Sequence, residues 1–117
     1  MMKTRQVAAL VSCCAVVVLA WALPAVAATT VNVTAGKPSE YRFTLSSKSV
    51  KAGSVTFKVT NKGKIPHDFS IGGKKTKLIQ PGKSATLKVT LKKGSSSYKC
   101  TVSGHAAAGM KGTLKVT

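Results

Sequence analysis

The chain has 117 residues, of which 19 are lysine or arginine and only two are acidic, so its formal net charge is +17 at pH 7. This length allows one domain with a modest core, and the charge favours anionic partners. Nucleic acid is not expected among them, because the aromatic residues fall on apolar strand positions instead of among the basic residues, and Arg42 is the only arginine after residue 27.

The first 27 residues have the pattern of a secretory signal peptide. Lys3 and Arg5 precede a long apolar stretch, which ends in Pro24 and the small residues Ala25 and Ala27. We expect cleavage after Ala27, which leaves residues 28–117 as an exported domain, in a periplasm, outside the cell or at its surface.

Two alternatives for this segment remain open. An uncleaved membrane anchor is possible in principle, because the apolar stretch is nearly long enough to cross a bilayer. A lipid-modified cysteine at Cys13 fits less well, because the apolar stretch continues well past that residue. The remaining residues, 28–117, contain no second hydrophobic span, so no transmembrane segment is expected after cleavage.

Apolar and polar residues alternate along most of residues 28–117, which predicts β-strands in preference to helices. The alternating apolar residues form seven groups: Val31 and Val33; Tyr41, Phe43 and Leu45; Val55, Phe57 and Val59; Phe69 and Ile71; Ala85, Leu87, Val89 and Leu91; Tyr98, Cys100 and Val102; Leu114 and Val116. Glycine and proline separate the groups, as in the turn Pro81-Gly82. Seven or eight short strands at this spacing predict an all-β fold, an antiparallel β-sandwich.

After signal removal, the chain contains one cysteine, one methionine and two histidines. A lone cysteine in an oxidising compartment cannot form an internal disulfide, so Cys100 is inert and buried, pairs with another chain, or binds a metal. Cys100, His105 and Met110 lie in one loop with four residues in each gap, and His67 lies far upstream, after Pro66. Two histidines and one cysteine around a trigonal metal, with a weak axial methionine, are the ligands of a blue-copper electron-transfer centre.

Zinc is the alternative metal for these residues. Structural zinc sites use four cysteine or histidine ligands, often in closely spaced pairs, whereas residues 28–117 offer three such residues. The expected cofactor is therefore one copper ion, which alternates between Cu(I) and Cu(II).

Residues 28–117 resemble a cupredoxin of the plastocyanin and azurin kind. Residues 61–69, which contain Pro-His-Asp, are similar to the family's first-histidine motif, and residues 100–112 are similar to its ligand loop. The resemblance implies a Greek-key β-sandwich of seven to eight strands. It also implies that the backbone amide of Asp68 helps to hold the Cys100 sulfur. The copper ligands that it implies are His67, Cys100, His105 and Met110.

The function expected from these features is that of an exported mononuclear blue-copper electron-transfer protein, and not of an enzyme. A copper-delivery protein with the same ligands is the alternative; it would favour one oxidation state and release the ion. Copper oxidases and nitrite reductases need further copper sites built from additional histidines, and both histidines of this chain are already assigned. A metal-free adhesive sandwich would leave the coincidence of four ligands unexplained.

The excess of lysine bears on the partner. Residues 28–117 contain 17 lysine and arginine residues against Glu40 and Asp68, a net charge of +15. We expect an acidic redox partner protein or an anionic surface, with an attraction that salt weakens. Solubility is the alternative reason for the lysines. The protein is expected to be a monomer.

Overall fold

A computed structural model describes residues 29–117, and the predicted signal peptide, residues 1–27, lies outside the described residues. The described part of the chain is built from strands, loops and turns. Its strands are β1 (Thr29–Ala35), β2 (Phe43–Leu45), β3 (Ser49–Val50), β4 (Gly53–Asn61), β5 (Ser70–Ile71), β6 (Lys74–Lys75), β7 (Ser84–Leu91), β8 (Gly94–Lys99) and β9 (Lys111–Val116). Within this range no helix is long and apolar enough to cross a membrane.

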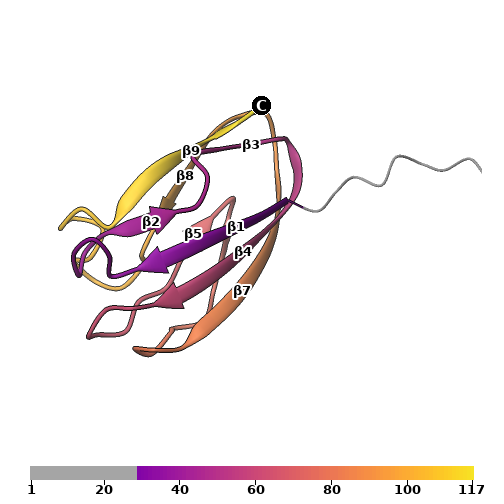
Figure 1. Ribbon diagram of the computed structural model, residues 1–117. Coiled ribbons are helices and arrows are strands. Elements are labelled where there is room, and N and C mark those ends of the chain that lie inside the picture. Colours follow the sequence, from indigo (N-terminus) through magenta and orange to yellow (C-terminus); the bar gives the residue numbers. More distant parts are fainter. Residues whose placement is uncertain (1–28) are drawn as a thin grey trace, which may run out of the picture.

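The strands form two sheets that face each other (Figure 1). One sheet has the order β2-β1-β4-β7 and the other the order β3-β9-β8-β5-β6. The predicted all-β sandwich is thereby confirmed, but the expectation of purely antiparallel sheets is wrong. Strand β1 pairs in parallel with β4, and β3 pairs in parallel with β9. Strands β1 and β4 can pair in parallel because the chain passes through β2 and then through β3, which lies in the other sheet, before it returns to the first sheet.

The alternating pattern of the sequence determines which side chains fill the space between the sheets. In β4 the side chains of Val55, Phe57 and Val59 are buried, and that of Lys58 is exposed. Each of these apolar residues also has a cross-strand partner in β7, as Phe57 has Leu87. Burial of such side chains, at about 25 cal/mol per Å² of apolar surface, is the main stabilising term of the fold.

An aromatic cluster forms the centre of the core, next to the end of the sandwich that carries the site described below. Phe69 is fully buried, and its ring centroid lies 5.3 Å from that of Phe43, 5.2 Å from that of Phe57 and 5.6 Å from that of Tyr98. The Tyr98 ring extends over Gly112 of β9, where any Cβ would overlap it. Glycine at 112 therefore makes room for the aromatic ring.

Each of the seven predicted groups overlaps a strand, but four of their residues lie outside it. Tyr41 precedes β2 and is 40% exposed, and Cys100 and Val102 follow β8, which ends at Lys99. Phe69 precedes β5, although it is buried. The two strands that the pattern did not predict, β3 and β6, are two residues long, which is too short for any alternation to show.

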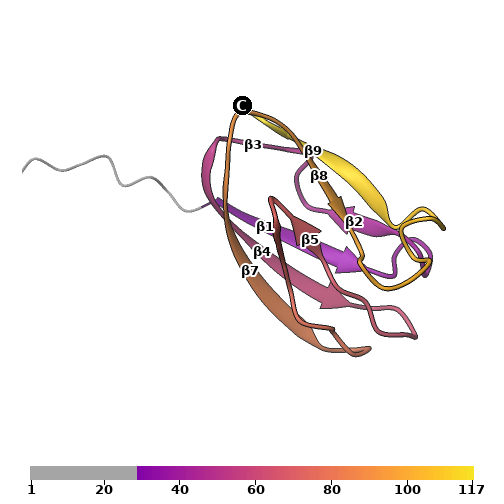
Figure 2. The same ribbon diagram turned by 180° about the vertical axis from the view of Figure 1, so that it is seen from behind.

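The loops that follow β1, β4 and β8 lie together at one end of the sandwich, away from the C-terminus (Figure 1; Figure 2 shows the same from behind). Because β1 and β4 run in parallel, their carboxyl ends meet at this end. The loop after β8, residues 100–110, reaches the same place. Three segments that are far apart in the sequence are thus brought into contact.

Candidate metal centre

Backbone pairing positions His67. It forms an isolated antiparallel bridge with Ile79, in which the His67 N–H donates to the Ile79 carbonyl at 3.1 Å and the Ile79 N–H donates back at 2.7 Å. The loop before it is held by Asn61, whose side-chain amide donates to the carbonyls of Ile65 and Ile79, both at 2.8 Å. The Gly63 N–H donates to the Asn61 side-chain oxygen at 2.8 Å. The side chains of Asn61 and His67 are fully buried.

The ligand loop closes on itself between β8 and β9. The Cys100 N–H donates to the Met110 carbonyl at 3.0 Å, and the Met110 N–H donates to the His105 carbonyl at 3.1 Å. The turn requires a positive φ of 81° at Gly104, a conformation that residues with a Cβ rarely adopt. As a result, Cys100, His105 and Met110 are all buried at the inner side of the loop.

Three of the predicted ligands converge on one point. The Nδ1 atoms of His67 and His105 lie 3.1 Å apart, and Cys100 Sγ lies 4.0 Å from the first and 3.5 Å from the second. A point in the plane of these atoms is about 2.1 Å from each of them, close to the 2.0–2.1 Å of zinc–imidazole bonds and slightly short of the ~2.3 Å of zinc–thiolate bonds. The donor atoms therefore already stand where a trigonal metal ion needs them.

The chemistry of these donors also fits copper. Thiolate suits Cu(I), imidazole suits both oxidation states, and a trigonal site of two histidines and one cysteine is the blue-copper arrangement. The described residues bring no other group of three or more histidine, cysteine or acidic side chains together. His67, Cys100 and His105 are thus arranged to bind one copper ion.

Met110 lies beside this triangle. Its side chain is fully buried and packs in one cluster with Cys100 and Ala35. Met110 is thus a neighbour of Cys100, and its role as a ligand stays a prediction.

Asp68 contacts the cysteine from the neighbouring loop. Its backbone N–H points at Cys100 Sγ with a separation of 3.5 Å, which is the contact that the sequence resemblance implied. Its carboxylate accepts hydrogen bonds from the backbone N–H and the hydroxyl of Thr101. Asp68 thereby connects the first-histidine segment to the ligand loop directly behind the sulfur.

Sequence reasoning counted Glu40 only as a charge, but the structure places it at the site. Its Oε1 lies 2.8 Å from His67 Nε2, on the side of the imidazole that faces away from the other ligands. The same carboxylate accepts hydrogen bonds from the backbone N–H groups of Lys64 and Ile65. One sequence signal could have revealed it: in a chain with 19 basic residues, Glu40 and Asp68 are the only acidic ones.

Burial sets the protonation of the ligands in the metal-free protein. Burial raises the pKa of the Cys100 thiol, with the amide N–H groups of Asp68 and Val102 opposing the shift. Burial and the neighbouring His67 lower the pKa of His105, which keeps that imidazole neutral. A metal ion held here would displace a proton from Cys100 and none from His105, so its binding would become tighter as the pH rises towards the thiol pKa.

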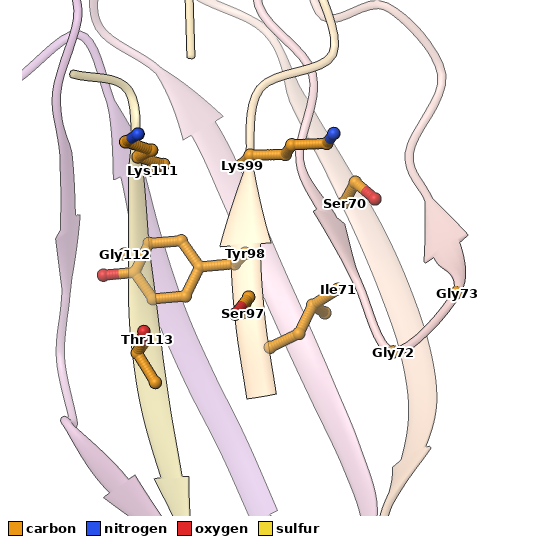
Figure 3. A pocket seen from close by; sticks show the side chains of 10 residues that line it. All are labelled: Ser70, Ile71, Gly72, Gly73, Ser97, Tyr98, Lys99, Lys111, Gly112 and Thr113. Atoms are coloured by element: carbon orange, nitrogen blue, oxygen red, sulfur yellow. The ribbon is translucent and has the colours of Figure 1, made fainter. Parts of the chain in front are cut away.

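A groove of about 550 Å³ lies elsewhere, along β5, β8 and β9 (Figure 3). Its lining includes Tyr98, the hydroxyls of Ser70, Ser97 and Thr113, and two lysines, Lys99 and Lys111, which are directly opposite in the β8–β9 pairing. No histidine, cysteine or carboxylate lines it. The groove therefore offers no copper ligand.

Comparison with known proteins agrees with the fold and the site. Residues 9–116 match the family model of the cupredoxin-like domain, so the chain belongs to the cupredoxin-like family. A search of curated proteins found no significant match. Among solved structures, auracyanin B is 27% identical with a TM-score of 0.68, over 77% of this chain and 89% of that one.

Two further structures have the same fold. Rusticyanin from Thiobacillus ferrooxidans is 25% identical with a TM-score of 0.58, over 75% of this chain and 76% of that one. Auracyanin A from Chloroflexus aurantiacus is 18% identical with a TM-score of 0.62, over 76% of this chain and 98% of that one. At that lower identity, the likeness concerns the fold alone.

Proposed function

We propose that the protein is an exported one-electron carrier with a single blue-copper site, and not an enzyme. The observation that carries the proposal is the triangle of two imidazole nitrogens and one sulfur, with sides of 3.1, 3.5 and 4.0 Å, buried at one end of a cupredoxin-like sandwich. The signal-peptide pattern of residues 1–27 supports export.

In this proposal the chain supplies metal ligands that are already in place and are shielded from water. Cys100 would hold the ion as a thiolate, His67 and His105 would hold it as neutral imidazoles through Nδ1, and Met110 would add a weakly bound thioether. Bound copper supplies the one-electron Cu(I)/Cu(II) couple. Because all four side chains are at most 8% exposed, water is largely excluded and the ligands need to rearrange little between the two oxidation states.

His105 is the ligand nearest to the solvent. Its side chain is 8% exposed, while those of His67, Cys100 and Met110 are 0%, 1% and 0% exposed. The small residues Ala106, Ala107 and Ala108 follow it, and the exposed Tyr41 ring packs edge-on against it with a centroid distance of 5.0 Å. A partner can therefore approach the imidazole edge closely, and we assign electron entry and exit to this surface.

The alternative function, copper delivery, uses the same ligands but differs in chemistry. A carrier must hold Cu(I) and Cu(II) tightly, whereas a delivery protein releases the state that it favours. The buried, fully hydrogen-bonded surroundings of the site support the carrier.

The test is a redox-cycling experiment on the mature protein. We expect Cu(II) titration to produce an intense visible thiolate-to-copper band that saturates at one equivalent. Reduction should bleach the band, and reoxidation after gel filtration should restore it in full, because Cu(I) stays bound. Loss of Cu(I) to a chelator during the reduced step, with little recovery of the band, would favour delivery instead.

We further propose an acidic redox partner, with the protein acting as a monomer. Lys37, Lys62 and Lys64 line a groove of about 500 Å³ next to Tyr41 and Glu40 at the copper end. Neither carboxylate of the chain forms an ion pair with a lysine among the described residues. Lys99 and Lys111 are also directly opposite each other, an arrangement that costs stability unless an anion compensates it.

Small redox reagents can test this steering without knowledge of the partner. Replacing Lys37, Lys62 and Lys64 together with glutamine should slow electron transfer with an anionic iron complex severalfold at low salt and leave a cationic cobalt complex unslowed, because the local attraction is reduced. The difference should shrink as ionic strength rises.

The matched control removes Lys48, Lys93 and Lys115, which line a groove at the opposite end of the sandwich. It should change the rate with the anionic complex much less. Equal slowing by both triple variants would mean that net charge alone matters and would contradict docking at the copper end.

A further inference from the structure

We propose that Glu40 is a positioning residue for the first histidine: it fixes the His67 ring and, by its negative charge, favours Cu(II) over Cu(I). This inference rests on the proposed function for its effect on copper, but its effect on His67 is a property of the metal-free protein. Glu40 does not touch the expected position of the metal and acts only through the imidazole.

The hydrogen bond between the two side chains determines the tautomer of His67. Both oxygens of the Glu40 carboxylate accept hydrogen bonds from backbone N–H groups, so this side chain is an acceptor in its contact with His67. His67 Nε2 must therefore carry the hydrogen in the 2.8 Å contact. Nδ1 is left with its lone pair directed at the other ligands, as metal binding requires.

Glu40 is itself held by the loop that it supports. Its Oε1 accepts from the backbone N–H groups of Lys64 and Ile65 at 3.0 and 3.1 Å, and its Oε2 accepts from Lys64 at 2.9 Å. These bonds and the contact with the fully buried His67 ring hold the carboxylate in one orientation. A carboxylate behind a metal-binding histidine raises the basicity of that ligand.

Gly63 provides independent support for this arrangement. A Cβ at residue 63 would overlap the Glu40 carboxylate and would lie 3.0 Å from His67 Nε2. The absence of a side chain at residue 63 therefore leaves room for the Glu40 carboxylate beside the His67 ring. The pair is also the only ion-pair geometry among residues 29–117, although 16 lysines and Arg42 are present there.

Three variants separate charge from position. Glu40→Gln can keep the Oε1 bonds to His67, Lys64 and Ile65 while removing the charge. Glu40→Ala removes both the charge and the bonds, and Gly63→Ala displaces the carboxylate by steric overlap. Thr90→Lys is the control for net charge: like Glu40→Gln it adds one positive charge, but on an exposed site opposite Ser54, at the far end of β4 from the metal centre.

The first measurement is made without copper, by ¹H–¹⁵N correlation of the imidazole nitrogens. We expect the Nε2–H tautomer of His67 in the wild type, in Glu40→Gln and in Thr90→Lys, and a mixture of tautomers in Glu40→Ala and Gly63→Ala. An Nδ1–H tautomer in the wild type, or an unchanged single tautomer in Glu40→Ala, would overturn the positioning role.

The second measurement is the reduction potential of the copper-loaded proteins. Glu40→Gln should weaken Cu(II) relative to Cu(I) about tenfold, which raises the potential by about 59 mV for a one-electron couple. Glu40→Ala should in addition lose about tenfold to a hundredfold in copper affinity, as do other changes behind metal-binding histidines. A potential in Glu40→Gln equal to that of the wild type, or an equal rise in Thr90→Lys, would overturn the effect of the charge.

Failure of the proposed function gives a different result. If the wild type itself formed no blue-copper band, the carrier function would be wrong, while the tautomer experiment would still decide the role of Glu40. If Glu40→Ala does not fold, Glu40→Gln and Gly63→Ala provide the same comparison.

Discussion

Replacement of Cys100 by serine is expected to abolish the visible absorption band of the copper-loaded protein and to weaken Cu(II) binding at least about a hundredfold. The reason is that a hydroxyl is not deprotonated near neutral pH, so it replaces neither the charge nor the bonding of the thiolate. The substitution is nearly isosteric, and the serine oxygen can still accept from the Asp68 amide that now points at the sulfur. Loss of copper binding would therefore not reflect loss of the fold.

The proton balance of binding provides a second measurement for the same variant. Burial raises the pKa of the Cys100 thiol, so this group is protonated at neutral pH and must lose its proton to copper. We expect about one proton to be released by the wild type, and its affinity to rise about tenfold per pH unit below the thiol pKa. Calorimetry in two buffers of different ionisation enthalpy measures this release. Cys100→Ser should release none, and a band or a proton release that survives the substitution would contradict the assignment of Cys100.

Replacement of Asn61 by alanine is expected to lower the free energy of unfolding of the metal-free protein by about 2 to 4 kcal/mol. The side chain is fully buried, and its removal leaves the Ile65 carbonyl and the Gly63 N–H without their partner at the base of the His67 loop. The Ile79 carbonyl loses one of its two hydrogen bonds and keeps the one from the His67 N–H. Each buried polar group that loses its partner costs about 1 to 3 kcal/mol, less where water can enter. Urea denaturation followed by circular dichroism measures the change.

The matched control is Asn32→Ala, at an exposed position of β1. Surface substitutions of this kind usually change stability by about 0.5 kcal/mol or less. Similar losses in both variants would contradict the bracing role of Asn61. Because Asn61 also orders the loop that donates the Lys64 and Ile65 amides to Glu40, its loss should shift the reduction potential as well.

Glu40 belongs to no recognisable motif, and the resemblance of residues 61–69 to the first-histidine motif assigns no role to Asn61. Glu40 is 27 residues from His67 in the sequence, and Asn61 is 18 residues from Ile79. Alternation of apolar residues reports only which face of a strand is buried. It carries no information about which loop meets which at the end of the sandwich, so these two residues could not be assigned before the fold was known.

Apolar alternation predicts seven of the nine strands of residues 29–117, and residue types predict the three side chains that converge at the metal centre. Three of the four predicted ligands lie in one short loop, so no knowledge of the fold is needed to bring Cys100, His105 and Met110 together. His67 could be added because it is the only other histidine of the chain. The resemblance of residues 61–69 and 100–112 to cupredoxin motifs then named the family that the comparison confirms.

Three features could be found only in the folded molecule: the parallel pairing of β1 with β4, the short strands β3 and β6, and the residues around the ligands. Strand pairing depends on the path of the chain between the sheets, and hydrogen bonds to a buried ring depend on which loops the two sheets bring into contact. Local sequence patterns contain no information on the strand pairing or on these hydrogen bonds. The ligands can thus be read from residue types and spacing, while the groups that orient and charge them become visible only once distant segments are in contact.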